Sequence, residues 1–202
     1  AKKMGGLDEL LAHIVTSRNQ LDAYIRYTRL YTDSLLNDET RPFPAAGQVA
    51  WIQDIFGAIP AGRGITTEVE CADDVIVPAM PVAMYSAVLL NLYTNATKAI
   101  IARASDEMPA KILISAWNDA RWHNVTVQDT GVGIPLEVRE RIWDPFYTTT
   151  SRVNSPLGSG MGLGLSLVRD LMSRVGGKAN VVEPSPGFMT SIHIRIPRNQ
   201  NG

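Results

Sequence analysis

Four glycines at alternate positions, Gly158, Gly160, Gly162 and Gly164, form the most unusual spacing in the sequence. Because glycine has no side chain, such a run lets the backbone come close to another group. The helix predicted to follow it offers free N–H groups to an anion such as phosphate. The run lacks the Lys-Ser or Lys-Thr of a P-loop, and its spacing differs from the dinucleotide fingerprint. A flexible linker or a helix-entry turn remains open as an alternative.

A second glycine turn follows a predicted strand that ends at Asp129, with Gly131 and Gly133 just beyond it. A carboxylate at the end of a strand can accept a hydrogen bond from an amino group. The two glycines would let a flat ring lie against the backbone. A simple D-x-G turn without a ligand is the alternative interpretation.

A third group of polar side chains, Asn91, Asn95 and Lys98, lies on a long apolar segment with spacings of four and three. These spacings place all three side chains on one face of a helix. Two carboxamides and an ammonium group are costly to bury without partners, and a metal ion with phosphates would suit them. A solvated polar stripe explains any one of them, but explains all three less well.

Periodicity predicts the elements that must position these residues. Helices are expected over residues 48–59, 81–104, 135–144 and 164–175, the second beginning near Pro81. Strands are expected over residues 64–71, 74–78, 110–117, 122–129, 178–184 and 189–197. This irregular alternation predicts an α/β (α+β) two-layer sandwich, with helices covering one face of a sheet.

The N-terminal region is predicted to be a separate element. Apolar residues follow one stripe over residues 7–36, which indicates a long helix, and Pro42 and Pro44 end it. A domain boundary is therefore expected at residue 44, with an N-terminal helix in 1–44 and a second domain in 45–202. The helix needs a partner, and either a second copy or the body of the protein could supply it.

The composition limits the classes of function. The chain has 202 residues, of which 45% are hydrophobic, and a formal charge of -1, which argues against a nucleic-acid binder. Cys71 is the single cysteine, so no internal disulfide can form and a reducing compartment is expected. The sequence contains no membrane-length apolar run and no secretory pattern, so we expect a cytoplasmic piece of a longer protein.

Four segments in order, "NLYTNATKA", "DTGVGIP", "WDPFYTTT" and "GSGMGLGLSL", closely resemble the N, G1, F and G2 boxes of one family. That family is the ATP-binding catalytic domain of sensor histidine kinases, which shares its superfamily with gyrase, heat-shock chaperones and mismatch-repair ATPases. The resemblance covers residues 45–197, and "GFMTSIHIRIP" resembles the closing strand, with Thr190 at the matching threonine. It implies a Bergerat-type fold with a mixed, mainly antiparallel sheet.

The resemblance also implies roles for single residues. Asn95 would coordinate Mg²⁺, Lys98 would neutralise phosphate charge, and Asp129 would read the adenine amino group. The later glycines would wrap the triphosphate as a mobile lid, and the loop containing Phe146 would close over the nucleotide. The full ATP-binding set that it implies is Asn91, Asn95, Lys98, Asp129, Gly131, Gly133, Ile134, Phe146, Thr148, Thr149, Gly158, Ser159, Gly160, Met161, Gly162, Leu163, Gly164 and Thr190.

Asn91 separates two functions of the superfamily. ATPases often have a water-activating glutamate at this position, and a carboxamide is no general base near neutral pH. The sequence therefore favours an ATP-dependent protein histidine kinase, with Asn91, Asn95 and Lys98 as catalytic residues. A serine kinase of the anti-sigma or dehydrogenase-kinase type, and a non-catalytic nucleotide-binding module, are the alternatives.

The expected partners are a histidine-bearing dimerisation helix upstream in the same protein and a response-regulator receiver domain, with a possible homodimer through residues 7–36. His13 lacks the acidic residue that follows the family's phosphoacceptor, so the acceptor is expected upstream. Thr150 stands where the family often has lysine, and Arg152 is a candidate for the missing charge. His123 and His193 fall on predicted strands and are interpreted as ordinary sheet residues.

Overall fold

The computed structural model describes residues 25, 32, 40–103, 108–147 and 164–198. Of the predicted N-terminal helix, it describes only Ile25 and Thr32, which are both helical and exposed. The rest of residues 7–36 lies outside the described residues, and the division of the chain at residue 44 stays a prediction. No described helix is both long enough and apolar enough to cross a membrane.

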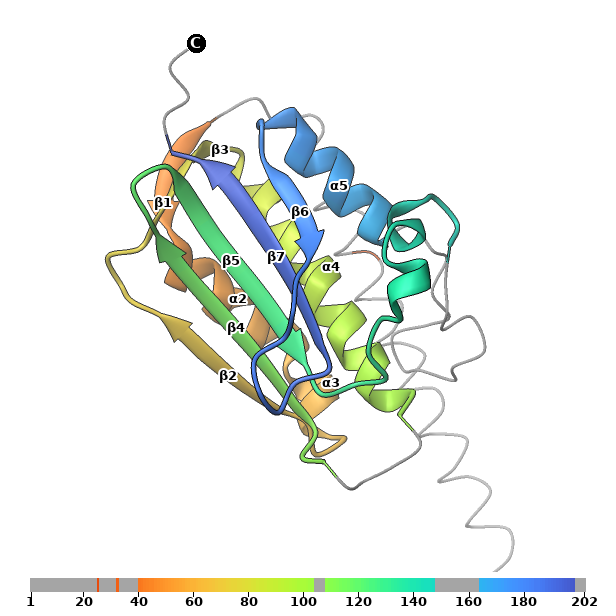
Figure 1. Cartoon of the computed structure of the whole chain (residues 1–202). Helices are drawn as coiled ribbons and strands as arrows, with labels where there is room; N and C mark the ends of the chain where they lie inside the picture. Colours follow the sequence, from red (N-terminus) through yellow and green to blue (C-terminus); the bar gives the residue numbers. More distant parts are fainter. Residues whose placement is uncertain (1–24, 26–31, 33–39, 104–107, 148–163, 199–202) are drawn as a thin grey trace, which may run out of the picture.

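Within the described residues, the main sheet has five strands in the order β2-β4-β5-β7-β6 (Figure 1). Strand β2 (Thr66–Cys71) pairs in parallel with β4 (Lys111–Asn118). The other pairs are antiparallel and involve β5 (Trp122–Asp129), β7 (Thr190–Pro197) and β6 (Lys178–Val181). The sheet is therefore mixed and mainly antiparallel, as predicted.

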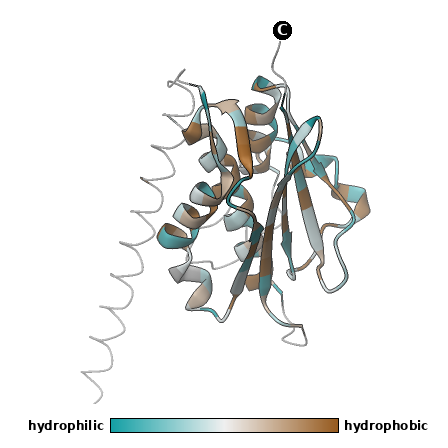
Figure 2. Cartoon of the chain, turned by 90° about the vertical axis from the view of Figure 1, so that its left-hand side faces the viewer, coloured by the Kyte–Doolittle hydropathy of each residue, from teal (hydrophilic) through white to brown (hydrophobic). Residues whose placement is uncertain are grey.

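The longer helices cover one face of this sheet, which Figure 2 shows edge-on. They are α2 (Ala45–Phe56), α4 (Val82–Ile101) and α5 (Gly164–Arg174), and a short helix, α3 (Ala58–Ala61), follows α2. Side chains that alternate along the central strands are buried between the two layers: Ile112, Ile114, Ala116, Val125, Val127, Ile192, Ile194 and Ile196. The period-2 pattern thus builds the core, and the predicted two-layer fold is confirmed.

A small second sheet was not predicted. Strand β1 (Arg41–Pro44) pairs antiparallel with β3 (Ile76–Met80), and its residue Phe43 is buried opposite Val77. Prolines have no N–H group to donate to a ladder, so they fit a short two-stranded ribbon better than a central strand. Pro42 and Pro44 are therefore compatible with the short strand β1.

The predicted helix 135–144 is wrong. The segment forms two 3-10 turns, Leu136–Val138 and Arg141–Trp143, and only Ile142 and Trp143 are buried. A short segment that buries so little apolar surface does not gain enough packing energy to hold a continuous α-helix. The two turns lead into the loop that contains Phe146.

Candidate functional site

Asn91 and Asn95 on α4 lie against the first residue of α5. A Cβ atom placed on Gly164 would lie 2.9 Å from Asn91 Oδ1 and 3.4 Å from Asn95 Nδ2. This spacing is too tight for a rigid neighbour, so glycine lets the two helices approach each other at this point. The N–H groups of the first turn of α5 have no partner within their own helix, and they begin next to the two carboxamides.

The three polar side chains of α4 differ in their surroundings. Asn91 is 4% exposed, and its Nδ2 donates to the Ala87 carbonyl of the same helix at 2.8 Å. Asn95 is half-buried, and no described group forms a hydrogen bond with its carboxamide. Burial lowers the pKa of Lys98, and neither ion pair found among the described residues involves it. Asn95 and Lys98 therefore have bonding capacity to offer a ligand.

Asp129 is the last residue of β5 and is only 4% exposed. Its Oδ1 accepts the N–H of Gly131 at 2.8 Å, and it also accepts a hydrogen bond from the side chain of Thr190, its partner on β7. Burial raises the pKa of Asp129 to about 6, although both hydrogen bonds oppose this shift. The carboxylate is therefore held in place but is still mostly ionised at neutral pH.

The turn after Asp129 packs directly on α4. A Cβ on Gly131 would lie 2.5 Å from the carbonyl carbon of Ala99, a contact that no side chain can make. The Val132 N–H donates to the Ala99 carbonyl at 3.3 Å, and Gly133 has a φ of +74°. The turn thereby brings Asp129 to the same stretch of α4 that carries Lys98.

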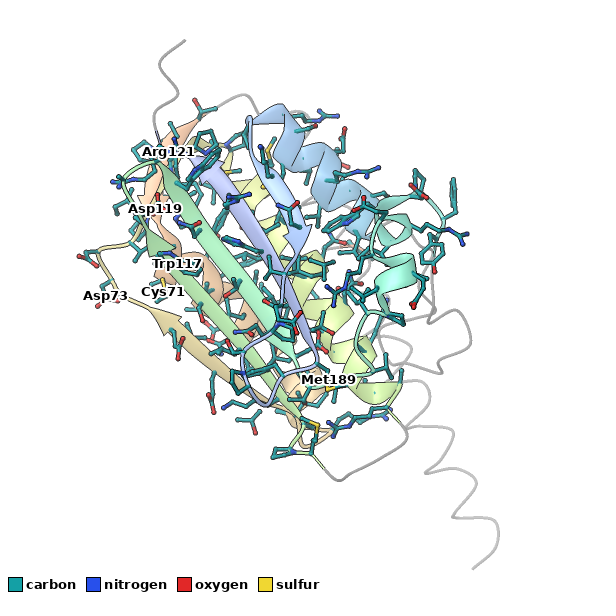
Figure 3. The ribbon with its side chains drawn as sticks, viewed as in Figure 1. Cys71, Asp73, Trp117, Asp119, Arg121 and Met189 are labelled. Carbon is teal, nitrogen blue, oxygen red and sulfur yellow. The ribbon has the colours of Figure 1, made fainter. Side chains whose placement is uncertain are left out.

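The strand end that faces this turn belongs to β7. The Met189 N–H donates to the Asp129 carbonyl at 2.8 Å, and Met189 lies at the lower end of the sheet in Figure 3. A Cβ on Gly133 would lie 3.4 Å from the Met189 carbonyl oxygen. Ile134 follows and packs, half-buried, against the core. Asp129, both glycines and Thr190 thus form one compact corner.

Phe146 lies in the loop after the second 3-10 turn. It is 75% exposed and has a φ of 66°, the single positive φ of a non-glycine residue in the described chain. Next to it, the Arg141 guanidinium lies 4.9 Å from the centre of the Tyr147 ring. Phe146 is therefore a point of backbone strain in this loop.

The structure brings most of the described site residues together around the C-terminal half of α4. Asn91, Asn95 and Lys98 lie on the helix, Gly164 begins α5, and Asp129 to Ile134 with Thr190 form the corner beside it. The remaining predicted residues lie outside the described residues: Thr148, Thr149, Gly158, Ser159, Gly160, Met161, Gly162 and Leu163. Arg152 and His13 lie outside them too, and every role assigned to a single residue stays a prediction.

The sequence pattern missed one side chain of this corner. Arg103, just beyond α4, donates from Nη1 to the Thr130 carbonyl and from Nη2 to the Met108 carbonyl, both at 2.6 Å. Arginine and lysine are favoured near a helix C-terminus, which is the only local signal for its position. Its partner Thr130 is far away in the sequence, so no local pattern could predict the contact.

The two histidines on strands are in sheet contacts, as predicted. His123 on β5 is fully buried, with Nε2 3.0 Å from the Tyr85 hydroxyl and Nδ1 2.8 Å from Asn118 Oδ1. Burial, aided by Arg198, lowers the pKa of His123 to about 4, so its ring is neutral. His193 on β7 lies on the other face, where its ring stacks on Trp117 with centroids 5.7 Å apart.

Comparison with known proteins identifies the fold and the family. Residues 83–200 match the family described as histidine kinase-, DNA gyrase B- and HSP90-like ATPase. The signal transduction histidine-protein kinase AtoS of Escherichia coli is 34% identical over 117 residues, which are 57% of this chain and 17% of AtoS. The chain spans about one sixth of the length of such curated relatives.

Solved structures agree with this match. The nucleotide-free catalytic domain of histidine kinase ThkA is 26% identical with a TM-score of 0.65, and the match covers 79% of this chain and 96% of that domain. The complex of ThkA with response regulator protein TrrA matches with a TM-score of 0.64 at 22% identity, over 90% of this chain and 49% of ThkA. The chain therefore belongs to the histidine kinase-, DNA gyrase B- and HSP90-like ATPase family, and it contains an ATP-binding domain of the histidine kinase type.

Proposed function

We propose that this chain is the catalytic domain of a two-component sensor histidine kinase. It binds Mg-ATP and transfers the γ-phosphate to a histidine on a dimerisation helix outside the described residues. The observation that carries the proposal is that two segments pack on α4: the start of α5 against Asn91 and Asn95, and the turn after Asp129 against Ala99, the neighbour of Lys98. The relatives, which are named as histidine kinases, support it.

Asp129 supplies the base recognition. A carboxylate accepts hydrogen bonds but donates none, so it suits the exocyclic amino group of adenine and opposes the carbonyl of guanine. Its pKa of about 6 leaves it mostly ionised at neutral pH, and the hydrogen bonds from Gly131 and Thr190 fix its orientation. Gly131 and Gly133 have no side chain, so a flat ring can approach the backbone at these two positions of the turn.

Asn95 and Lys98 supply the phosphate side. Mg²⁺ prefers oxygen ligands and is usually shared between one or two protein groups and the phosphates of a substrate. The Asn95 carboxamide oxygen, which no described group occupies, fits such an ion. When bound, the ion would neutralise charge on the transferring phosphate. The Lys98 ammonium has no carboxylate partner among the described residues and would pair with phosphate instead.

Asn91 favours transfer to a protein over hydrolysis. Its carboxamide is buried and donates to the Ala87 carbonyl, and it has no ionisable proton acceptor for activating water. Phosphoryl transfer depends mainly on positioning and charge stabilisation, which Lys98 and the start of α5 would supply. We propose that the glycine run before α5, with Thr148 and Thr149, forms a lid over the phosphates.

The partners follow from the same proposal. The histidine acceptor lies on a dimerisation helix, and a receiver domain accepts the phosphate onward, in keeping with the response regulator that accompanies ThkA in its complex. Residues 7–36 are a candidate second helix of the dimerisation hairpin. A homodimer through this segment is part of the proposal.

The test uses γ-labelled ATP and a longer chain that includes the upstream segment. Label on the protein that is labile in acid and stable in base would indicate phosphohistidine and support the proposal. Label that is stable in acid would favour a serine kinase instead. Heat of ADP binding without any label would indicate a non-catalytic nucleotide-binding module.

Asn95→Ala tests the phosphate side, with Asn180→Ala as the matched control. Asn180 is exposed on β6 and faces away from α4, so its variant should behave as the wild type. Asn95→Ala should remove the Mg²⁺ dependence of ATP binding and nearly all of the label. Full labelling in that variant would refute the role of Asn95 as a ligand.

A further inference from the structure

One peptide unit in the corner around Asp129 is held by hydrogen bonds at both its N–H and its C=O. The peptide between Thr130 and Gly131 has its N–H on Asp129 Oδ1 at 2.8 Å and its C=O on Arg103 Nη1 at 2.6 Å. A trans peptide is planar, with its C=O and N–H pointing in opposite directions. An arginine that fixes the carbonyl therefore also fixes the direction of the N–H that holds the carboxylate.

We propose that Arg103 is a positioning residue for base recognition. It locks the Thr130–Gly131 peptide so that the Asp129 carboxylate keeps the orientation that accepts the adenine amino group. This inference rests on the proposed function, in which Asp129 reads the base. Arg103 does not touch the nucleotide and acts through the peptide alone.

The surroundings of Thr130 show that Arg103 belongs to a larger hydrogen-bonded cluster. The Thr130 hydroxyl donates to the Pro109 carbonyl at 2.8 Å and accepts the Lys111 N–H at 2.9 Å. The second nitrogen of Arg103 holds the Met108 carbonyl at 2.6 Å. This cluster consists of Arg103, Thr130 and residues 108–111. Its hydrogen bonds connect the end of α4 and the start of β4 to the turn that follows Asp129.

The two hydrogen bonds favour arginine over lysine at this position. Hydrogen bonds from a charged donor are stronger than neutral ones. The planar fork of the guanidinium holds two separate carbonyls in a fixed geometry, whereas a lysine ammonium is a compact point charge on a flexible stem. A guanidinium on the C=O also polarises the peptide, which strengthens the N–H bond to the carboxylate. Both effects favour the ionised form of Asp129.

No charged group of the described residues is among the causes of the pKa shift of Asp129. Within the part of the chain that the structure describes, the charged groups on the elements packed around it are Lys98 and Arg103 at the end of α4 and Lys111 on β4. Lys111 pairs with Glu68, while Thr190 on β7 is uncharged. The pKa of Asp129 is set by burial, which raises it, and by the bonds from Gly131 and Thr190, which lower it. Loosening the Gly131 bond should therefore raise this pKa further.

The experiment measures binding of ADP and GDP by calorimetry between pH 5.5 and 8.5 for three variants and the wild type. Arg103→Met keeps the aliphatic stem and removes both donors, and Arg103→Lys keeps the charge without the fork. Arg198→Met is the matched control, because Arg198 also donates to a backbone carbonyl at 2.6 Å, that of Asp119 at the far end of β5. Thermal unfolding of each variant is recorded alongside.

For Arg103→Met, we expect the ADP Kd at pH 7.5 to rise about tenfold and the preference for ADP over GDP to fall by a similar factor. The pH midpoint of ADP binding should move upward by about one unit. Arg103→Lys should show a smaller shift in the same direction, and Arg198→Met should show neither change. A stability loss alone would not move the midpoint or the base preference.

Arg103→Met with an unchanged midpoint and base preference would overturn the inference. If that variant does not fold, the decision rests on Arg103→Lys, whose midpoint either shifts or stays at the wild-type value. A wild-type chain that binds neither ADP nor ATP would instead contradict the proposed function itself. The two failures are therefore distinguishable.

Discussion

The two ends of strand β5 each bury a titratable side chain, but to different effect. At one end, His123 is fully buried, its ring is neutral, and each ring nitrogen has a partner inside the protein. At the other end, Asp129 is nearly as buried, yet its pKa of about 6 leaves it charged at neutral pH. Figure 3 shows these ends by Asp119 and Arg121 above and Met189 below.

The partners of His123 explain the difference. Asn118 Nδ2 donates to the Ile76 carbonyl, so its Oδ1 accepts from His123 Nδ1, and the Tyr85 hydroxyl donates to Nε2. This chain of hydrogen bonds is closed, and it joins α4, both sheets and the end of β4. The carboxylate of Asp129 can still accept a further bond. A closed network stabilises a fold, whereas a charged group with bonding capacity left is suited to a ligand.

Of the variants considered, Asp129→Asn should have the largest effect on ADP binding. An amide nitrogen would face the adenine amino group, so a charge-assisted bond is lost and two donors oppose each other. We expect the ADP Kd to rise about 100-fold. Asp119→Asn is the control at the other end of β5: an amide oxygen can still accept the N–H groups of Arg121 and Trp122, and only the bond from Asn124 Nδ2 is lost. If calorimetry shows equal ADP affinity in both variants, the proposal that the Asp129 end of β5, and not the Asp119 end, binds the nucleotide is contradicted.

The same variant should change the dependence of stability on pH. The folded-state pKa of Asp129 is raised, so its contribution is present below pH 3.8 and is lost as pH rises through about 6. His123 has a lowered pKa, so its contribution is present above pH 6.5 and is lost as pH falls toward 4. Between pH 4 and 6 the two groups oppose each other.

Asp129→Asn leaves the His123 contribution unopposed. Its free energy of unfolding should match that of the wild type near pH 4 and exceed it by on the order of 2 kcal/mol at pH 7.5. Urea unfolding at several pH values measures this difference. A constant offset across the range would contradict the raised pKa of Asp129.

Gly131→Ala should damage stability and binding together. The new methyl group would lie within 2.7 Å of Asp129 Oδ1 and closer still to the Ala99 backbone, so the turn must move. We expect the free energy of unfolding to fall by about 2 kcal/mol and ADP binding to weaken. Gly47→Ala in α2 is the control, since a Cβ there meets nothing within 4 Å. An unchanged melting temperature in Gly131→Ala would contradict the close contact.

Tyr85→Phe should give the smallest effect, and this effect should be a loss of stability around His123 without a change in ADP binding. It leaves the Nε2 atom of the buried His123 without its donor, which should lower the free energy of unfolding by about 1 kcal/mol. The ADP Kd should stay within twofold of the wild-type value. A large loss of ADP affinity in this variant would show that the closed network also serves the site.

Strong local patterns made the central elements predictable. Helix α4 was predicted over residues 81–104 and forms over Val82–Ile101, because Pro81 sets its start and its apolar residues repeat with the helical period. Strands β4 and β5 also match their predicted ranges closely. Asn91, Asn95 and Lys98 share a face for the same reason, since helical spacing alone determines which side they occupy.

The rest depends on contacts that no local pattern encodes. The pairing of Phe43 with Val77 and the hydrogen bond from Arg103 to the Thr130 carbonyl join residues far apart in the sequence. The 135–144 segment has a helical pattern, but only Ile142 and Trp143 are buried in the core. Too little of the segment packs on the rest of the protein to stabilise a continuous helix. The corner around Asp129 was predicted from family resemblance, and its hydrogen bonds became visible only in the fold.

The parallel pairing of β2 with β4 has a consequence for how the protein is made. Parallel neighbours cannot be joined by a tight hairpin, so the chain must return along the sheet between Cys71 and Lys111, and α4 is part of that return. Long-range pairing of this kind forms slowly, whereas a helix forms early. We therefore expect α4 to form before the β2–β4 pairing completes the sheet. Completion of the sheet that carries Asp129 is then expected to be a late event in the folding of this domain.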